Sequence, residues 1–233
     1  MGVSYKLGVD AAIVLKYGGA DQAVIKGLNR MGLPGLLREV IKLNEFRVDF
    51  AVEVTGEGSH GRFTFGGNLV TGDTKGQDQL KQYLKDNTKF TDCRWYLDLN
   101  DFIAPDLAND PDNAGFQVSK VEPGEAQKNG TFPLSGEMVT NGLYCYFVAH
   151  QTDDATPTMA FVTGTPATIT DSGSGFVTSG FKAGQTLIVE GSTSNDGQYL
   201  IANVAAGTIT LATGETLASE PAVDGTALHG GKL

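Results

Sequence analysis

A glycine-rich hexapeptide at residues 56–61, Gly-Glu-Gly-Ser-His-Gly, carries the most chemically suggestive spacing in the chain. Its letters match the G-x-G-x-x-G fingerprint, which holds a pyrophosphate where a strand passes into a helix. The residues that follow, Arg62 to Phe65, alternate as a strand does, so the required helix is not expected. The segment therefore indicates a glycine-rich hairpin connection, and a nucleotide-dependent enzyme built on it is the weaker alternative.

A second candidate is an acidic cluster around two prolines. Its spacing begins like a calcium-binding loop, but no glycine occupies the sixth position and Val121 occupies the twelfth. We therefore expect a solvated acidic loop. The cluster consists of Asp98, Asp101, Asp106, Asp110 and Asp112.

Histidines and cysteines are too few and too scattered to predict a catalytic or metal site. His60, His150 and His229 have no carboxylate or cysteine at ligand spacing, so surface histidines are expected. Cys93 and Cys145 sit among aromatic residues, which favours buried free thiols made in a reducing cytoplasm. We expect no enzyme, no catalytic residue, no cofactor and no metal.

Composition points to a soluble, mainly β chain. It has 233 residues, 31 of them glycine, and 19% are charged, which is typical of a turn-rich globular protein. The early apolar run from Ala11 to Leu15 is too short for a secretion signal, and no run is long enough to cross a bilayer. The net charge of −10 argues against sequence-specific binding of nucleic acid.

One amphipathic helix interrupts the β pattern. Thr74 stands three residues before Gln77, a capping-box spacing that predicts a helix start near Lys75. An apolar stripe follows at helical spacing, so the helix should pack on the flank of a sheet; the stripe consists of Leu80, Tyr83 and Leu84. The aromatic segment from Phe90 to Leu99 then predicts a core strand.

The remaining pattern predicts two β domains: residues 1–152, a linker at 153–158, and a C-terminal β-sandwich at 159–233. The apolar stretch from Met31 to Leu37 predicts a loop that needs a cover. Candidate strands of the first domain are 11–16, 23–28, 39–46, 48–54, 62–65, 116–121 and 143–149. Those of the second are 159–162, 167–170, 186–190, 198–204 and 208–211.

Three groups of segments give the chain a resemblance to the major tail tube protein of long-tailed, non-contractile (siphovirus-type) bacteriophages. The segments are 67–73 with the helix and 90–99 after it; 7–11 with 32–41; and 180–184, 191–197 and 204–207 in the C-terminal region. The last group is similar to small Ig-like β domains carried by phage tail proteins. The resemblance implies a tail-tube β-sandwich or barrel with one flanking helix, and an all-β decoration domain.

The resemblance also implies a function. The chain would be a structural virion protein, assembled in the host cytoplasm, that forms stacked hexameric rings and hence the hollow tube for genome ejection. Its partners would be further copies of itself, the tape measure protein, other tail proteins, and DNA passing through the lumen without specific binding. We further expect acidic side chains to line that lumen, because a basic wall would retain phosphates.

Two loops are the predicted contact regions between subunits or rings. The predicted contact residues are Met31, Leu33, Pro34, Leu36, Leu37, Glu57, Ser59, His60 and Arg62. The alternative function is a β-sandwich module that binds carbohydrate or a cell surface.

Overall fold

The computed structural model of the chain describes residues 11–34, 36–43, 52–125, 130–153, 156–221 and 223–232. Residues 7–10 and 35 of the segments that carry the resemblance, and residues 44–46 and 48–51 of two predicted strands, lie outside this range. Residues 36–43, 52–60 and 232 are described by their backbone alone.

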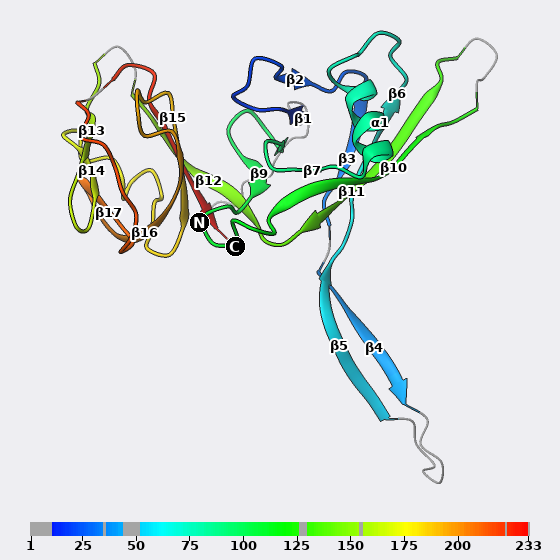
Figure 1. Cartoon of the computed structure of the whole chain (residues 1–233), viewed down its shortest axis with the longest axis horizontal. Helices are drawn as coiled ribbons and strands as arrows, with labels where there is room; N and C mark the ends of the chain where they lie inside the picture. The colour runs from blue at the N-terminus through cyan, green and yellow to red at the C-terminus, as the bar shows by residue number, and fades with distance from the viewer. Residues whose placement is uncertain are drawn as a thin grey trace. The chain divides into compact units, whose positions relative to one another are not determined.

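The described chain is mainly β with one α-helix, which confirms the predicted fold class (Figure 1). The helix is α1 (Gln77–Asp86). The strands up to α1 are β1 (Ala12–Leu15), β2 (Ala23–Val24), β3 (Leu28–Gly32), β4 (Leu36–Leu43), β5 (Val52–His60) and β6 (Phe63–Asn68). Those after it are β7 (Lys89–Phe90), β8 (Arg94–Tyr96), β9 (Phe102–Pro105), β10 (Gly115–Pro123), β11 (Pro133–Asn141), β12 (Tyr144–Thr152), β13 (Met159–Val162), β14 (Thr168–Asp171), β15 (Thr186–Glu190), β16 (Gly197–Ala205), β17 (Thr208–Leu211) and β18 (Ala227–Lys232).

The chain divides into two compact units that do not follow the sequence order. Unit 1 contains the described residues up to Val24, Thr91–Gly115 and those from Gly142 onward. Unit 2 contains Ile25–Phe90 and Phe116–Asn141. The predicted boundary at 153–158 lies inside unit 1, where β12, which precedes it, pairs with β18, which follows it. Independent folding of residues 159–233 stays a prediction.

Unit 1 is built on one sheet of eleven strands in the order β13-β14-β17-β16-β15-β18-β12-β9-β8-β1-β2. Side chains alternate between its two faces, so β15 supplies Leu187 and Val189 to one core and Ile188 to another. The larger core also contains Phe161, Phe176, Phe181, Ile209 and Leu228. The smaller one contains Phe102, Ala104, Cys145, Phe147 and Ile188.

A β-bulge in β12 changes which residues of this strand face each core. Phe147 pairs with Gly231 and Ala149 pairs with Gly230, so Val148 is an extra residue without a partner in β18. Cys145 and Phe147 therefore point into the smaller core, whereas Ala149 points into the larger one. After the bulge, the side chain of His150 returns to the face that carries the smaller core.

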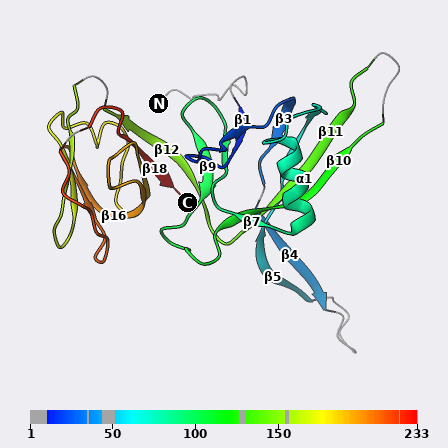
Figure 2. The same ribbon diagram turned by 45° about the horizontal axis from the view of Figure 1, so that its top comes forward.

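Unit 2 is a five-stranded sheet in the order β3-β6-β11-β10-β7, and α1 covers one face of it (Figure 2). The helix buries Leu80 and Tyr83, and the Tyr83 ring stacks on Phe90 with centroids 4.6 Å apart. The predicted third residue of the stripe, Leu84, is 36% exposed. The ring of Phe116 continues the aromatic contacts from Phe90 into the sheet.

The start of α1 differs from the predicted capping box. Gly76 occupies the N-cap position and has no side chain to accept a hydrogen bond. The acceptor is Asp73 Oδ2, which receives the backbone N–H of Gln77 at 2.9 Å. Gln77 is fully buried; its amide donates to the carbonyls of Lys26 and Asn68, at 2.7 and 2.9 Å. The Gln77 side chain therefore links the helix to the sheet by hydrogen bonds. The helix starts at Gln77, two residues later than the expected start near Lys75.

The ribbon formed by β4 and β5 corrects two predictions. Residues 56–60 belong to β5, so the expected hairpin connection at 56–61 is wrong; only Gly61 and Arg62 separate β5 from β6. The glycines instead accompany a bulge, since β5 has one more residue than β4 between the pairs Arg38 with Gly58 and Val40 with Thr55. The expected loop at 31–37 is also wrong at both ends, which lie in β3 and β4.

In the C-terminal region the observed strands agree best with those predicted from the sequence. The predicted strands 159–162, 186–190 and 208–211 have those bounds in the structure, and the other two differ by one residue at their ends. The expected aromatic strand at 90–99 is two strands, β7 and β8, in different sheets.

Candidate functional site

The nine predicted contact residues lie together in unit 2, where β3, the β4–β5 ribbon and β6 meet. Their distribution is Met31 in β3, Leu33 and Pro34 after it, Leu36 and Leu37 in β4, Glu57, Ser59 and His60 in β5, and Arg62 before β6. Leu33 is 45% exposed, although it is apolar. Whether these residues contact another subunit stays a prediction.

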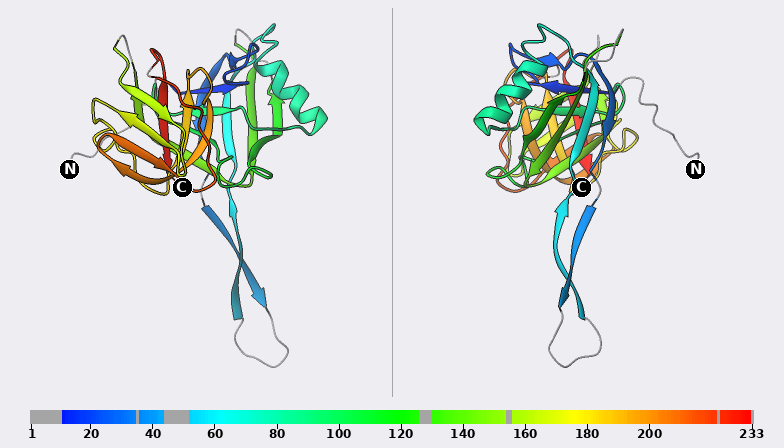
Figure 3. Two further views of the ribbon diagram at one scale, coloured as in Figure 1. Left: turned by 60° about the vertical axis from the view of Figure 1, so that its left-hand side comes forward. Right: turned by 90° about the vertical axis from the view of Figure 1, so that its right-hand side faces the viewer.

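The β4–β5 ribbon offers two open backbone edges. Its strands pair from Leu36 with His60 to Leu43 with Val52, and neither strand pairs with another strand of the described chain. Figure 3 shows the ribbon extending away from the five-stranded sheet in both views. An isolated two-stranded ribbon is marginally stable in water, and its unpaired N–H and C=O groups are a template for another strand. The geometry suits docking of backbone to backbone.

A pocket of about 410 Å³ lies among the strands of the five-stranded sheet. Its charged lining residues are Arg30, Lys120 and Glu137, and Met31 from the predicted contact set also lines it. Glu137 pairs with Arg62 at 2.5 Å, and Lys120 pairs with Glu122 at 2.8 Å, which raises the pKa of Lys120. This part of unit 2 has charges of both signs.

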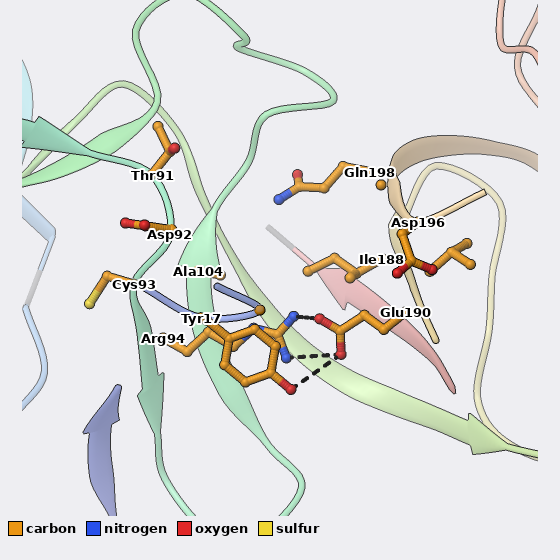
Figure 4. Close-up of a pocket in the computed structure, with 13 residues that line it drawn as sticks. Tyr17, Thr91, Asp92, Cys93, Arg94, Ala104, Ile188, Glu190, Asp196 and Gln198 are labelled. Atoms are coloured by element: carbon orange, nitrogen blue, oxygen red, sulfur yellow. Dashed lines mark hydrogen bonds and ion pairs between the residues drawn. The ribbon is translucent and has the colours of Figure 1, made fainter. Parts of the chain in front are cut away.

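Unit 1 contains an ion pair between Arg94 of β8, which is buried, and Glu190 of β15, which is partly exposed. The Arg94 guanidinium donates to both carboxylate oxygens of Glu190, and the Tyr17 hydroxyl lies 3.4 Å from Glu190 Oε2 (Figure 4). Arg94 is 5% exposed and sits between two rings, with its Cζ 3.5 Å from the Tyr17 centroid and 4.2 Å from that of Phe102. Burial would raise the pKa of Glu190, but hydrogen bonds from His229 and Arg94 outweigh it and lower that pKa.

The network continues from Glu190 through two histidines to an aspartate. His229 Nε2 lies 3.1 Å from Glu190 Oε2, the two Nδ1 atoms of His229 and His150 are 2.9 Å apart, and His150 Nε2 lies 3.1 Å from Asp101 Oδ1. The expectation of scattered surface histidines is therefore wrong for this pair. His150 and His229 are directly opposed on β12 and β18, which explains why rings 79 residues apart in sequence meet.

The acidic cluster is not the solvated loop that was expected. Asp101 is 7% exposed and Asp106 is fully buried, where it accepts from the Thr186 hydroxyl at 2.8 Å and from the Cys145 thiol at 3.1 Å. Asp98 and Asp110 cap turns by accepting from nearby backbone N–H groups. Across the described ranges, His, Cys, Asp and Glu nowhere form a group of three or more suited to a metal ion.

Both cysteines are buried, as predicted, and neither forms a disulfide. Burial raises the pKa of Cys145 to about 12, and the hydrogen bond with Asp106 acts in the same direction. Burial likewise raises the pKa of Cys93 well above its usual value. A thiol held protonated is a poor nucleophile, so the two cysteines serve packing.

A pocket of about 350 Å³ lies beside the Arg94–Glu190 pair. Its lining includes the apolar residues Ala104 and Ile188 and the polar residues Asp92, Asp196 and Gln198 (Figure 4). Gln198 is already engaged, since its amide donates to the carbonyl of Pro105 at 3.1 Å and accepts from the N–H of Leu107 at 2.8 Å. The Gln198 side chain thus joins β16 to the end of β9 and to the residues that follow it.

No family model and no curated protein matches the chain. Among solved structures, a chain from the virion of a native gene transfer agent particle matches with a TM-score of 0.41 and 14% identity, covering 61% of this chain and 98% of that one. The tail of an empty gene transfer agent particle with C6 symmetry gives 0.41 and 14%, covering 60% and 97%. The six-fold symmetrised baseplate of the anti-feeding prophage gives 0.42 and 10%, covering 62% and 97%. At these TM-scores and identities, the matches do not establish what this chain does.

No helix in the described part of the chain is long and apolar enough to span a membrane.

The amino-acid pattern did not predict the Arg94–Glu190–His229–His150–Asp101 network, because its members come from four strands and one turn. A period-two reading of residues 186–190 could have placed Glu190 on the same face as Ile188, but it could not have supplied the partner.

Proposed function

We propose that the chain is a structural subunit of a phage tail tube that assembles as stacked hexameric rings and forms the conduit for genome ejection. The sequence resemblance to tail tube proteins supports this proposal. The observation that carries it is the β4–β5 ribbon, which holds five of the nine predicted contact residues and leaves both backbone edges unpaired among the described strands.

Physical reasons favour an assembly role for this ribbon. A two-stranded ribbon without a third strand or a packed face gains too little to offset the entropy of ordering its backbone. Pairing with a neighbouring subunit would satisfy the open edges, and repetition around a ring would leave no edge unpaired. Burial of the exposed Leu33 side chain would add to the contact.

The decisive experiment removes the ribbon and keeps the sheet. Leu36 and His60 are paired at the ribbon's base, so replacing residues 37–59 with Asn-Gly closes the chain by a two-residue turn. We expect concentrated wild-type protein to form rings or hollow tubes in negative-stain electron microscopy, and the shortened variant to remain unassembled. The variant should keep a cooperative thermal unfolding transition, because the five-stranded sheet does not pair with the ribbon.

The control is Arg62→Ala, which removes one predicted contact side chain but keeps the ribbon. We expect tubes to form more weakly with this variant, at a higher protein concentration. Normal tubes from the shortened variant would show that the ribbon is not the assembly element. A wild-type protein that stays monomeric at every concentration and with added tail initiator would remove the tail-tube proposal itself.

A further inference from the structure

The paired histidines of unit 1 pose a problem of proton counting. A neutral imidazole carries one N–H, so two neutral rings supply two protons. Each Nε2 faces a carboxylate at 3.1 Å, and an ionised carboxylate only accepts, so both Nε2 atoms must donate. The two Nδ1 atoms are 2.9 Å apart, and this contact needs a proton of its own. The observed geometry therefore uses three protons.

We propose that His150 and His229 bind one extra proton as a pair, forming a singly charged imidazole–imidazolium hydrogen bond across β12 and β18. The pair would act as a built-in pH sensor that holds these two strands together most firmly while it carries a single charge. This device lies within unit 1 and does not depend on the proposed assembly into tubes.

Charges around the pair favour one added proton. Asp101 bonds to His150, Asp98 acts on it from the same turn, and Glu190 on β15 bonds to His229. Arg94 on β8 is bound to Glu190, and Tyr17 contributes a neutral hydroxyl. A proton added to either ring would lie beside the carboxylate bonded to that ring, Asp101 or Glu190, and this attraction favours one imidazolium.

A second proton is disfavoured. Burial and the charge of His229 both lower the pKa of His150, although Asp101 opposes them. The rings are packed closely, with centroids 5.1 Å apart, and the Phe102 ring lies edge-on to His229 at 5.3 Å. Two imidazolium rings would point N–H groups at each other across 2.9 Å, so double protonation should break the contact.

The direction of the pH effect follows from counting protons in each state. In the unfolded chain both histidines titrate at about pH 6.5. Below that pH the unfolded chain binds two protons and the folded pair binds one, so stability falls as the pH falls. Above it the unfolded pair binds none and the folded pair keeps one, so stability falls as the pH rises. The pair should thus give a stability maximum between these two limits.

The protonation state can be observed directly in a His60→Gln chain, which leaves only the two paired rings. Histidine side-chain ¹⁵N NMR at about pH 7 should show three protonated ring nitrogens and one unprotonated ring nitrogen. The two titration steps should be separated by more than about one pH unit. Two bare nitrogens, or two independent single-step titrations, would overturn the proposal.

A stability measurement gives an independent test. Urea midpoints are measured for the His60→Gln chain and for the same chain with His150→Gln and His229→Gln. The measurements run from about pH 5 to about pH 9, a range that brackets the ordinary histidine pKa of about 6.5. The difference between them should peak at intermediate pH and shrink on both sides. A difference that does not vary with pH overturns the proposal. If the double variant does not fold, the NMR measurement on the His60→Gln chain still decides.

Discussion

Arg94 shows how the fold accommodates a charged side chain within a sheet. Its guanidinium is almost fully removed from solvent, and two aromatic rings and one carboxylate replace the lost water. Glu190 keeps 24% of its side chain exposed, so the pair lies at the margin of the interior. A pair in this position stabilises the fold chiefly by avoiding an unpaired charge.

Removing the guanidinium should therefore be costly. We expect Arg94→Ala to lower the free energy of unfolding by about 2–3 kcal/mol, because Glu190 is left partly buried without its cation. The matched control is Arg62→Ala, whose side chain is 62% exposed beside Glu137 and which should change stability by less than about 0.5 kcal/mol. Urea denaturation of both variants measures the difference. Equal losses would mean that burial does not govern the strength of these pairs.

The helix α1 shows what local spacing can and cannot predict about an element. Its existence and its buried side follow from the apolar stripe, because Leu80 and Tyr83 lie one turn apart. The cap does not follow, since Asp73 and Thr74 are both good acceptors and only the path of the preceding chain selects Asp73. Asp73 is chosen because it also accepts from the backbone N–H of Lys26 at 3.2 Å.

This assignment of the cap is testable with two neighbouring substitutions. Asp73→Ala should destabilise the protein by about 1–2 kcal/mol, since the backbone N–H groups of Gln77 and Lys26 lose their acceptor. Thr74→Ala should have little effect. Thermal unfolding followed by circular dichroism compares the two. A larger loss at Thr74 would restore the capping box predicted from sequence.

Strand prediction succeeded where the signal is local and failed where packing decides. Residues 186–190 and 208–211 are rich in β-branched residues between glycine turns, and both are strands as expected. The strands β9, β11 and β18 were not predicted. β11 begins with Pro133 and contains Gly136, and β18 contains two glycines, all poor strand formers. Gly231 is required because a Cβ there would lie 2.7 Å from the Phe147 ring.

At the scale of the whole molecule, the chain leaves unit 1 after Val24, builds most of unit 2, and crosses between the units three further times. Sequence composition suggested a division at 153–158 because that stretch is polar and contains proline. Nothing in the local pattern reveals that β18 returns to pair with β12, and this pairing makes the eleven-stranded sheet continuous. Pairing over such a sequence distance depends on the packed cores on both faces.

Acid should destabilise unit 1. Burial would raise the pKa of Glu190 and of Asp171, but hydrogen bonds to each carboxylate outweigh it and lower both pKa values. Groups with a lowered folded pKa contribute stability above their unfolded pKa, about 4 for these side chains, and lose it as the pH falls.

Fluorescence of the buried Trp95, the chain's single tryptophan, reports unfolding of unit 1. We expect the urea midpoint of the wild-type protein to decrease as the pH is lowered from about 7 to about 3.5. The midpoint of the Glu190→Gln variant should decrease less steeply over the same range. A midpoint independent of pH would contradict this.

The bulge at Val148 has a consequence for which sequence changes the protein can accept. Val148 is 44% exposed, so many side chains would fit there. Deleting Val148 would place Phe147 directly before Ala149, and these two side chains already point to opposite faces. The strand would then alternate regularly, and His150 would stay on the face of the smaller core. Relatives of this chain should therefore vary freely in the amino acid at position 148 and should also tolerate its loss.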